Sequence, residues 1–153
     1  MKYAIMSDVH ANPAALEKAL KDSRAVGCEK FILLGDITGY GYDPKRALEL
    51  VRENFDVVLM GNHDSACLGL EPEWEVEGNI NYDLDRKAHE QLSESELEWL
   101  RERRYLHAGD RFIVSMLLRR LILMSVENRP IGRKYCVRDR SSWIRQVGCL
   151  SAV

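Results

Sequence analysis

The chain has 153 residues, of which 46% are hydrophobic and 30% charged, and its formal net charge is −2. These values are typical of a soluble globular protein of one domain and argue against a strongly basic chain. The longest apolar region, residues 112–126, contains Arg119 and Arg120 and is shorter than the ~20 residues that a membrane span needs. The amino terminus has no evident signal-peptide pattern, so we expect a cytoplasmic protein without a membrane partner.

Three short apolar runs near the amino terminus predict strands. They cover residues 3–6, 31–34 and 57–60. Runs of this length without polar alternation are typical of buried parallel strands. The pairs Asn12-Pro13 and Asp43-Pro44 each predict a helix start, because a polar N-cap followed by proline at the first helical position is favoured. We therefore expect a β-α-β-α-β arrangement with a parallel sheet.

The middle of the chain carries weaker signals. Residues 71–77 are acidic and read as an exposed loop or lid. Ser93 and Glu96 have the spacing of a capping box, which predicts a helix that ends near Arg104. We expect another strand to begin at Phe112.

Polar clusters follow each of the three predicted strands directly. Asp8 and His10 follow the first strand, Asp36 follows the second, and residues 62–64 (Asn-His-Asp) follow the third. Each cluster taken alone has an ordinary alternative as a turn or a helix cap. Their recurrence in one order favours a shared site, because ligands bind at the carboxyl ends of parallel strands in open α/β sheets.

The residue types in these clusters suit a site for two metal ions. Asp8 supplies a carboxylate oxygen and His10 an imidazole nitrogen to one cation, and Asp36 could bridge two cations. Asn62 offers a neutral oxygen to the second cation, and His63 could donate a proton without being a ligand. Two cations about 3.5–4 Å apart can clamp a phosphoryl group and activate a water for in-line attack.

The three clusters resemble the motifs of the calcineurin-like metallophosphoesterases, in particular the small bacterial and archaeal phosphodiesterases. The matching segments are residues 7–12 (Ser-Asp-Val-His-Ala-Asn), 34–40 (Leu-Gly-Asp-Ile-Thr-Gly-Tyr) and 60–64 (Met-Gly-Asn-His-Asp), and the resemblance covers about residues 1–114. It implies an α/β/β/α sandwich with two mixed sheets. The implied function is metal-dependent hydrolysis of a phosphodiester or phosphomonoester by an activated water.

The resemblance also implies the role of each site residue. Asp8 and His10 bind the first metal, Asp36 bridges, and Asn62 binds the second metal. His63 is the catalytic proton donor, with Asp64 beside it as a second catalytic residue. The expected cofactors are two divalent ions, manganese first, with iron, zinc, nickel or magnesium as alternatives. The expected partner is a small phosphorylated substrate.

One part of the family pattern is missing from this chain. Family members complete the site with further histidines after a later strand and in a Gly-His-x-His cluster. The four histidines here are His10, His63, His89 and His107. Where Val-His-Gly or Val-His-Ala is expected, the sequence has Val114 followed by serine. We therefore expect a metallophosphoesterase-like domain over residues 1–114 that is incomplete in its carboxyl-terminal half. The alternative function is a catalytically impaired protein, either a scaffold or a truncated product.

Residues 115–153 form the second predicted unit, an atypical basic tail. Residues 1–110 hold 13 Lys and Arg against 22 Asp and Glu, whereas residues 111–153 hold 9 against 2. This change suggests a frame-shifted or disordered segment. Tyr135 and Trp143 among the arginines leave nucleic-acid binding open as an alternative, which we do not favour because the charges are scattered.

Overall fold

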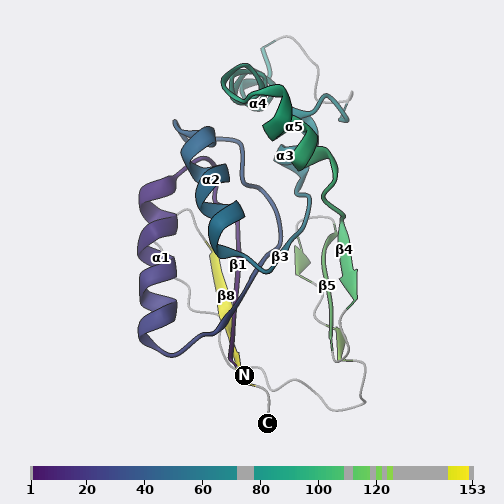
Figure 1. Ribbon diagram of the computed structural model, residues 1–153. Helices are drawn as coiled ribbons and strands as arrows, with labels where there is room; N and C mark the ends of the chain where they lie inside the picture. The colour runs from purple at the N-terminus through teal and green to yellow at the C-terminus, as the bar shows by residue number, and fades with distance from the viewer. Residues whose placement is uncertain are drawn as a thin grey trace.

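The computed structural model describes residues 2–71, 78–108, 112–117, 120–121, 124–125 and 145–151. In chain order its elements are β1 (Lys2–Ser7), α1 (Pro13–Ala25), β2 (Lys30–Leu33), α2 (Pro44–Asn54), β3 (Val57–Val58), α3 (Asn62–Cys67), α4 (Ile80–Gln91), α5 (Glu94–Arg101), β4 (Leu106–Ala108), β5 (Phe112–Leu117), β6 (Arg120–Leu121), β7 (Met124–Ser125) and β8 (Arg145–Ser151). In Figure 1, α1 and α2 lie on one side of β1, and β4 and β5 lie on the other. Helices α3, α4 and α5 gather at one end of the molecule.

The strands form two sheets. The first has the order β3-β2-β1-β8, and β1, β2 and β3 are parallel, which confirms the predicted β-α-β-α-β arrangement. β8 pairs antiparallel with β1 and makes this sheet mixed. The second sheet has the order β4-β5-β6, with β7 also paired to β5, and its described pairs are antiparallel. The predicted α/β architecture with two sheets is therefore confirmed.

The helix starts of α1 and α2 are where the sequence predicts them. The Asn12 side chain accepts a hydrogen bond from Ala15 N at 3.1 Å, and the Asp43 side chain accepts one from Arg46 N at 2.9 Å. A proline occupies the first turn of each helix. Each helix returns the chain to a neighbouring parallel strand, so the carboxyl ends of β1, β2 and β3 lie along one edge of the sheet.

Both faces of the first sheet are buried at β1 and β2. One face packs in the core cluster with α1 and α2, and its strand residues are Ala4, Met6, Phe31 and Leu33. Ile5 and Ile32 alternate with these residues and are no more than 2% exposed. Burial on two sides explains why the strand runs are continuously apolar.

Part of the predicted tail belongs to this sheet, because β8 pairs with β1 over its whole length. The division of the chain at residue 115 stays a prediction, as does its origin in a frame shift. The acidic loop predicted at residues 71–77 lies almost entirely outside the described residues. Among the helices that the structure describes, none has the length and hydropathy to cross a membrane.

Candidate metal centre

The loop after β1 is joined to the loop after β2 by backbone hydrogen bonds. Asp8 N donates to Gly35 O at 3.2 Å, and His10 N donates to Asp36 O at 2.9 Å. This pairing continues the parallel ladder beyond the ends of the strands. It therefore brings the first two polar clusters of the sequence together.

Asp8, His10 and Asp36 form a group that could hold a metal ion. One ligand atom from each lies within 4.8 Å of the others. All three residues have positive φ, with values of 60°, 47° and 57°. A left-handed backbone is unfavourable for residues other than glycine and is concentrated at functional sites. Among the described residues other than glycine, only Ala11 shares it, so the strain is concentrated on this group.

The His10 ring is oriented with one nitrogen toward the group. Its Nδ1 lies 3.1 Å from Thr38 O and acts as the donor, because a carbonyl can only accept. Nε2 then lies 3.5 Å from Asp8 Oδ1 and is available as a ligand atom. Burial lowers the pKa of His10, but the hydrogen bond to Asp8 and the charge of Asp36 outweigh it, so the pKa lies above its usual value.

Asp36 is the most enclosed carboxylate of the group, with 2% of the residue exposed. Its Oδ1 accepts a hydrogen bond from His63 N at 2.9 Å. Burial first, and the nearby Asp64 carboxylate second, raise the pKa of Asp36 to about 6. A buried carboxylate with this pKa is costly to ionise, and a cation beside it would offset the cost.

Two glycines allow the loops after β2 and β3 to meet. A Cβ on Gly61 would lie 2.2 Å from both the backbone nitrogen and Oδ1 of Asp36. A Cβ on Gly35, which has φ +114°, would lie 2.3 Å from Gly61 N. Glycine is therefore required at both positions for the third polar cluster to reach the second.

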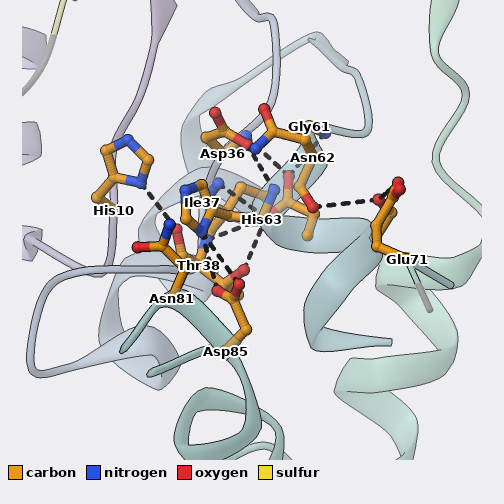
Figure 2. A network of polar contacts seen from close by, with 12 residues as sticks. His10, Asp36, Ile37, Thr38, Gly61, Asn62, His63, Glu71, Asn81 and Asp85 are labelled. Carbon is orange, nitrogen blue, oxygen red and sulfur yellow. Dashed lines mark hydrogen bonds and ion pairs between the residues drawn. The ribbon is translucent and has the colours of Figure 1, made fainter. Parts of the chain in front are cut away.

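The third cluster lies in α3, which begins at Asn62. Asn62 lies between Gly61, whose backbone is packed against Asp36, and His63, whose N donates to Asp36 Oδ1 (Figure 2). The structure thus brings Asn62 into the same neighbourhood as Asp36. The Asn62 role as a ligand stays a prediction.

Asp64 has a holding role in this geometry. It is fully buried, and its Oδ2 accepts hydrogen bonds from Asp36 N at 2.8 Å and Gly61 N at 3.0 Å. Its Oδ1 accepts from Ile37 N at 2.8 Å and from the backbone and side chain of Thr38 at 3.0 and 3.2 Å. The carboxylate therefore ties the loop after β2 to α3. If Asp64 contributes to catalysis as predicted, it does so indirectly, by positioning the loop that carries Asp36.

His63 has a partner that the sequence analysis missed. Its Nδ1 lies 3.0 and 3.2 Å from the two carboxylate oxygens of Asp85 in α4, and the side chains are 5% and 1% exposed (Figure 2). The signal in the sequence was a carboxylate at helical spacing from Ala88 and Leu92, both of which are buried. A charged residue on such a stripe needs a partner, which here is the predicted proton donor.

Tyr40 completes the surroundings of the two histidines. Its ring centroid lies 4.7 Å from those of both His10 and His63, and the two imidazoles are 4.9 Å apart. Tyr40 is 43% exposed, whereas both histidines are buried. The tyrosine ring therefore covers the imidazoles on the solvent side.

The donor set fits a divalent transition-metal ion. Two carboxylates and an imidazole are the mixed oxygen and nitrogen ligands that manganese, iron, zinc or nickel accept. Because His10 Nδ1 donates to Thr38 O, its Nε2 is the nitrogen on the side of Asp8. A cation beside the buried Asp36 carboxylate would stabilise its ionised form. The identity and the number of ions stay predictions.

Comparison with known proteins shows which family of sequences this chain resembles. The sequence model of the calcineurin-like phosphoesterases matches residues 1–127. An uncharacterized protein of Methanocaldococcus jannaschii is 43% identical over 68 residues, which are 44% of this chain and 28% of that protein.

Two crystal structures resemble the fold. A metallophosphoesterase from Sphaerobacter thermophilus has a TM-score of 0.62 and 33% identity, covering 74% of this chain and 45% of the other. A protein described provisionally as a diadenosine tetraphosphatase has a TM-score of 0.50 and 22% identity, covering 69% and 44%. The chain thus spans less than half the length of these relatives.

Proposed function

Because the chain belongs to the calcineurin-like phosphoesterase family, we propose that it hydrolyses a phosphodiester or phosphomonoester at the centre formed by Asp8, His10 and Asp36. The observation that carries the proposal is the convergence of these three ligand atoms within 4.8 Å, on a left-handed backbone, at the ends of adjacent parallel strands. Such strain is retained where the surrounding structure holds it for a function.

The convergence of Asp8, His10 and Asp36 supports the ligand roles in this proposal. Asp8 and His10 Nε2 would hold a first divalent ion, Asp36 would serve both ions, and Asn62 would contribute to a second ion. Bound ions of this kind polarise the phosphoryl group and lower the pKa of a water so that it attacks in line. Manganese is the first candidate metal.

His63 is the proposed proton donor to the leaving oxygen. Its Nδ1 lies against the Asp85 carboxylate, so in this proposal Nε2 is the nitrogen that donates to the leaving oxygen. A buried carboxylate at Nδ1 also fixes the orientation of the ring. Asp64 supports the reaction by holding the loop of Asp36 against α3.

A second candidate function is favoured by the absence of histidine after His107 in the sequence. With only the bridging Asp36 and the neutral Asn62 available, the second ion would bind weakly. Under this alternative the chain binds one ion and has little turnover, as a scaffold or an impaired enzyme. We also propose a cytoplasmic location and a small phosphorylated substrate.

A manganese titration with bis(p-nitrophenyl) phosphate tests the proposal. We expect slow turnover that rises with manganese and is lost on Asp36→Asn. His63→Ala should lower turnover while manganese still binds. Manganese binding without turnover would select the second candidate. Absence of manganese binding would contradict both.

A further inference from the structure

The exposed ring of Tyr40 is fixed beside the candidate centre. Its edge contacts with His10 and His63, at centroid distances of 4.7 Å and interplanar angles of 61° and 64°, make a cluster of three rings. Only the tyrosine has a large solvent-exposed fraction, 43% against 7% for His10 and 4% for His63. Tyr40 therefore presents its ring to solvent beside both imidazoles.

The loop that carries Tyr40 is pinned on both sides of the ring. Gly39 has φ +116°, and a Cβ there would lie 2.8 Å from His10 Nδ1. A Cβ on Gly41 would lie 2.1 Å from His10 O and 2.5 Å from Ala11 O. Glycines at both positions let the backbone on either side of Tyr40 pack closely against the segment that carries His10.

Tyr40 lies where the leaving group of the proposed substrate would be placed. In the proposed function His63 donates to the leaving oxygen through Nε2, because Asp85 holds its Nδ1. The atoms attached to that oxygen would then lie beside the His63 ring, whose centroid is 4.7 Å from that of Tyr40. A flat aromatic group there would stack on the exposed part of Tyr40, whereas a short alkyl group would leave it in water.

We propose that Tyr40 is a specificity-determining residue that stacks on the leaving group, so that the centre prefers phosphoesters of nucleosides or aryl alcohols to those of aliphatic alcohols. This inference rests on the proposed phosphoesterase function. It adds a substrate class to that function, and it predicts a difference in binding affinity that can be measured without turnover.

Binding of non-hydrolysable phosphonates to the manganese-loaded chain tests the inference by calorimetry. Benzylphosphonate mimics phenyl phosphate, and propylphosphonate mimics ethyl phosphate with the same charge. We expect benzylphosphonate to bind roughly ten-fold more tightly. Tyr40→Leu should bring the ratio close to one, and Tyr40→Phe should preserve it. Tyr42→Leu is the matched control from the same loop, because Tyr42 is 71% exposed, and it should also preserve the ratio.

The outcomes separate this inference from the proposed function. Equal affinities of the unmodified chain for the two phosphonates would overturn the role of Tyr40. An unchanged ratio in Tyr40→Leu would do the same and would leave the residue as packing. Inorganic phosphate serves as the probe of the centre itself. If it fails to bind the manganese-loaded chain, the proposed function fails and the inference fails with it. A thermal melt of each variant checks that it is folded.

Discussion

Asp36→Asn should stabilise the metal-free protein at neutral pH. Burial is the main cause that raises the pKa of Asp36 in the folded state to about 6, against an ordinary value of 3.8. The cost of ionising this group is absent below pH 3.8, grows as the pH rises, and is complete above pH 6. At 1.36 kcal/mol per pKa unit, the cost is about 3 kcal/mol at most.

Asparagine removes this cost without removing the hydrogen bond. Its Oδ1 can still accept from His63 N, which lies 2.9 Å from Asp36 Oδ1. For a chain of this size the melting temperature at pH 7.5 in EDTA should rise by up to roughly 6–12 °C. The advantage should shrink as the pH is lowered toward 4. Thermal melts followed by circular dichroism across this pH range measure both effects.

The same variant should lose its response to metal. Manganese at about 100 times its dissociation constant stabilises a binding protein by about 2.7 kcal/mol. We expect this gain in the unmodified chain and a much smaller one in Asp36→Asn. The variant is thus the more stable protein in EDTA but responds less to manganese. This exchange of stability for binding is expected of a metal ligand and not of a structural carboxylate.

Asp56→Asn is the control with the opposite sign. Burial raises the pKa of Asp56, but hydrogen bonds from Lys30 and Phe31 together outweigh it, so its pKa lies below the usual value. Its stabilising contribution is present above the unfolded-state pKa and is lost as the pH falls through the lower folded-state pKa. Asp56→Asn should not stabilise the protein at pH 7.5 and should leave the manganese response intact. The reasoning is refuted if Asp36→Asn is destabilised in EDTA at pH 7.5 while its manganese response persists.

Three further substitutions test the way the site is held. Gly61→Ala should destabilise by about 1–3 kcal/mol or prevent folding, because its Cβ would meet backbone and carboxylate atoms at 2.2 Å. Gly69→Ala, where a Cβ meets nothing within 4 Å, should cost only about 1–2 kcal/mol of backbone strain, and urea titration of both variants measures the difference. Asp64→Asn should lower stability by about 3 kcal/mol or more, since an amide nitrogen would face backbone donors, and a melt unchanged from the original would contradict this. Asp85→Asn should lower any turnover roughly ten-fold or more with manganese affinity unchanged, whereas exposed Asp83→Asn should alter neither. Imidazole ¹⁵N shifts provide a readout of Asp85→Asn that needs no turnover.

The first half of the fold was predictable because its signals are local. Continuous apolar runs marked β1 and β2, and the caps at Asn12 and Asp43 marked the helix starts. The third strand, Val57–Val58, is shorter than its apolar run: Leu59 N still donates to Leu33 O at 2.9 Å, and Leu59 also forms a bridge with Arg104. That contact joins residues far apart in the chain, and hydropathy carries no information about it.

The candidate site was also predictable where its signals are local. Asp8, His10 and Asp36 were grouped by their place after successive strands, and the structure brings them together. The partner of His63 was missed. The helical spacing of Asp85 from Ala88 and Leu92 indicates a buried position, but it does not show which residue elsewhere in the chain Asp85 meets, and His63 is 22 residues away. The left-handed backbone of the group was also not predicted. Aspartate and histidine adopt it more often than most residues other than glycine, but this preference is too weak to mark individual positions.

The central claim is that Asp8, His10 and Asp36 together bind a divalent ion. Anomalous diffraction from a crystal soaked in manganese tests it most directly. The account predicts a peak at coordination distance, about 2.0–2.3 Å, from a carboxylate oxygen of each aspartate and from His10 Nε2. A manganese peak elsewhere, with these side chains keeping their mutual contacts, would contradict it.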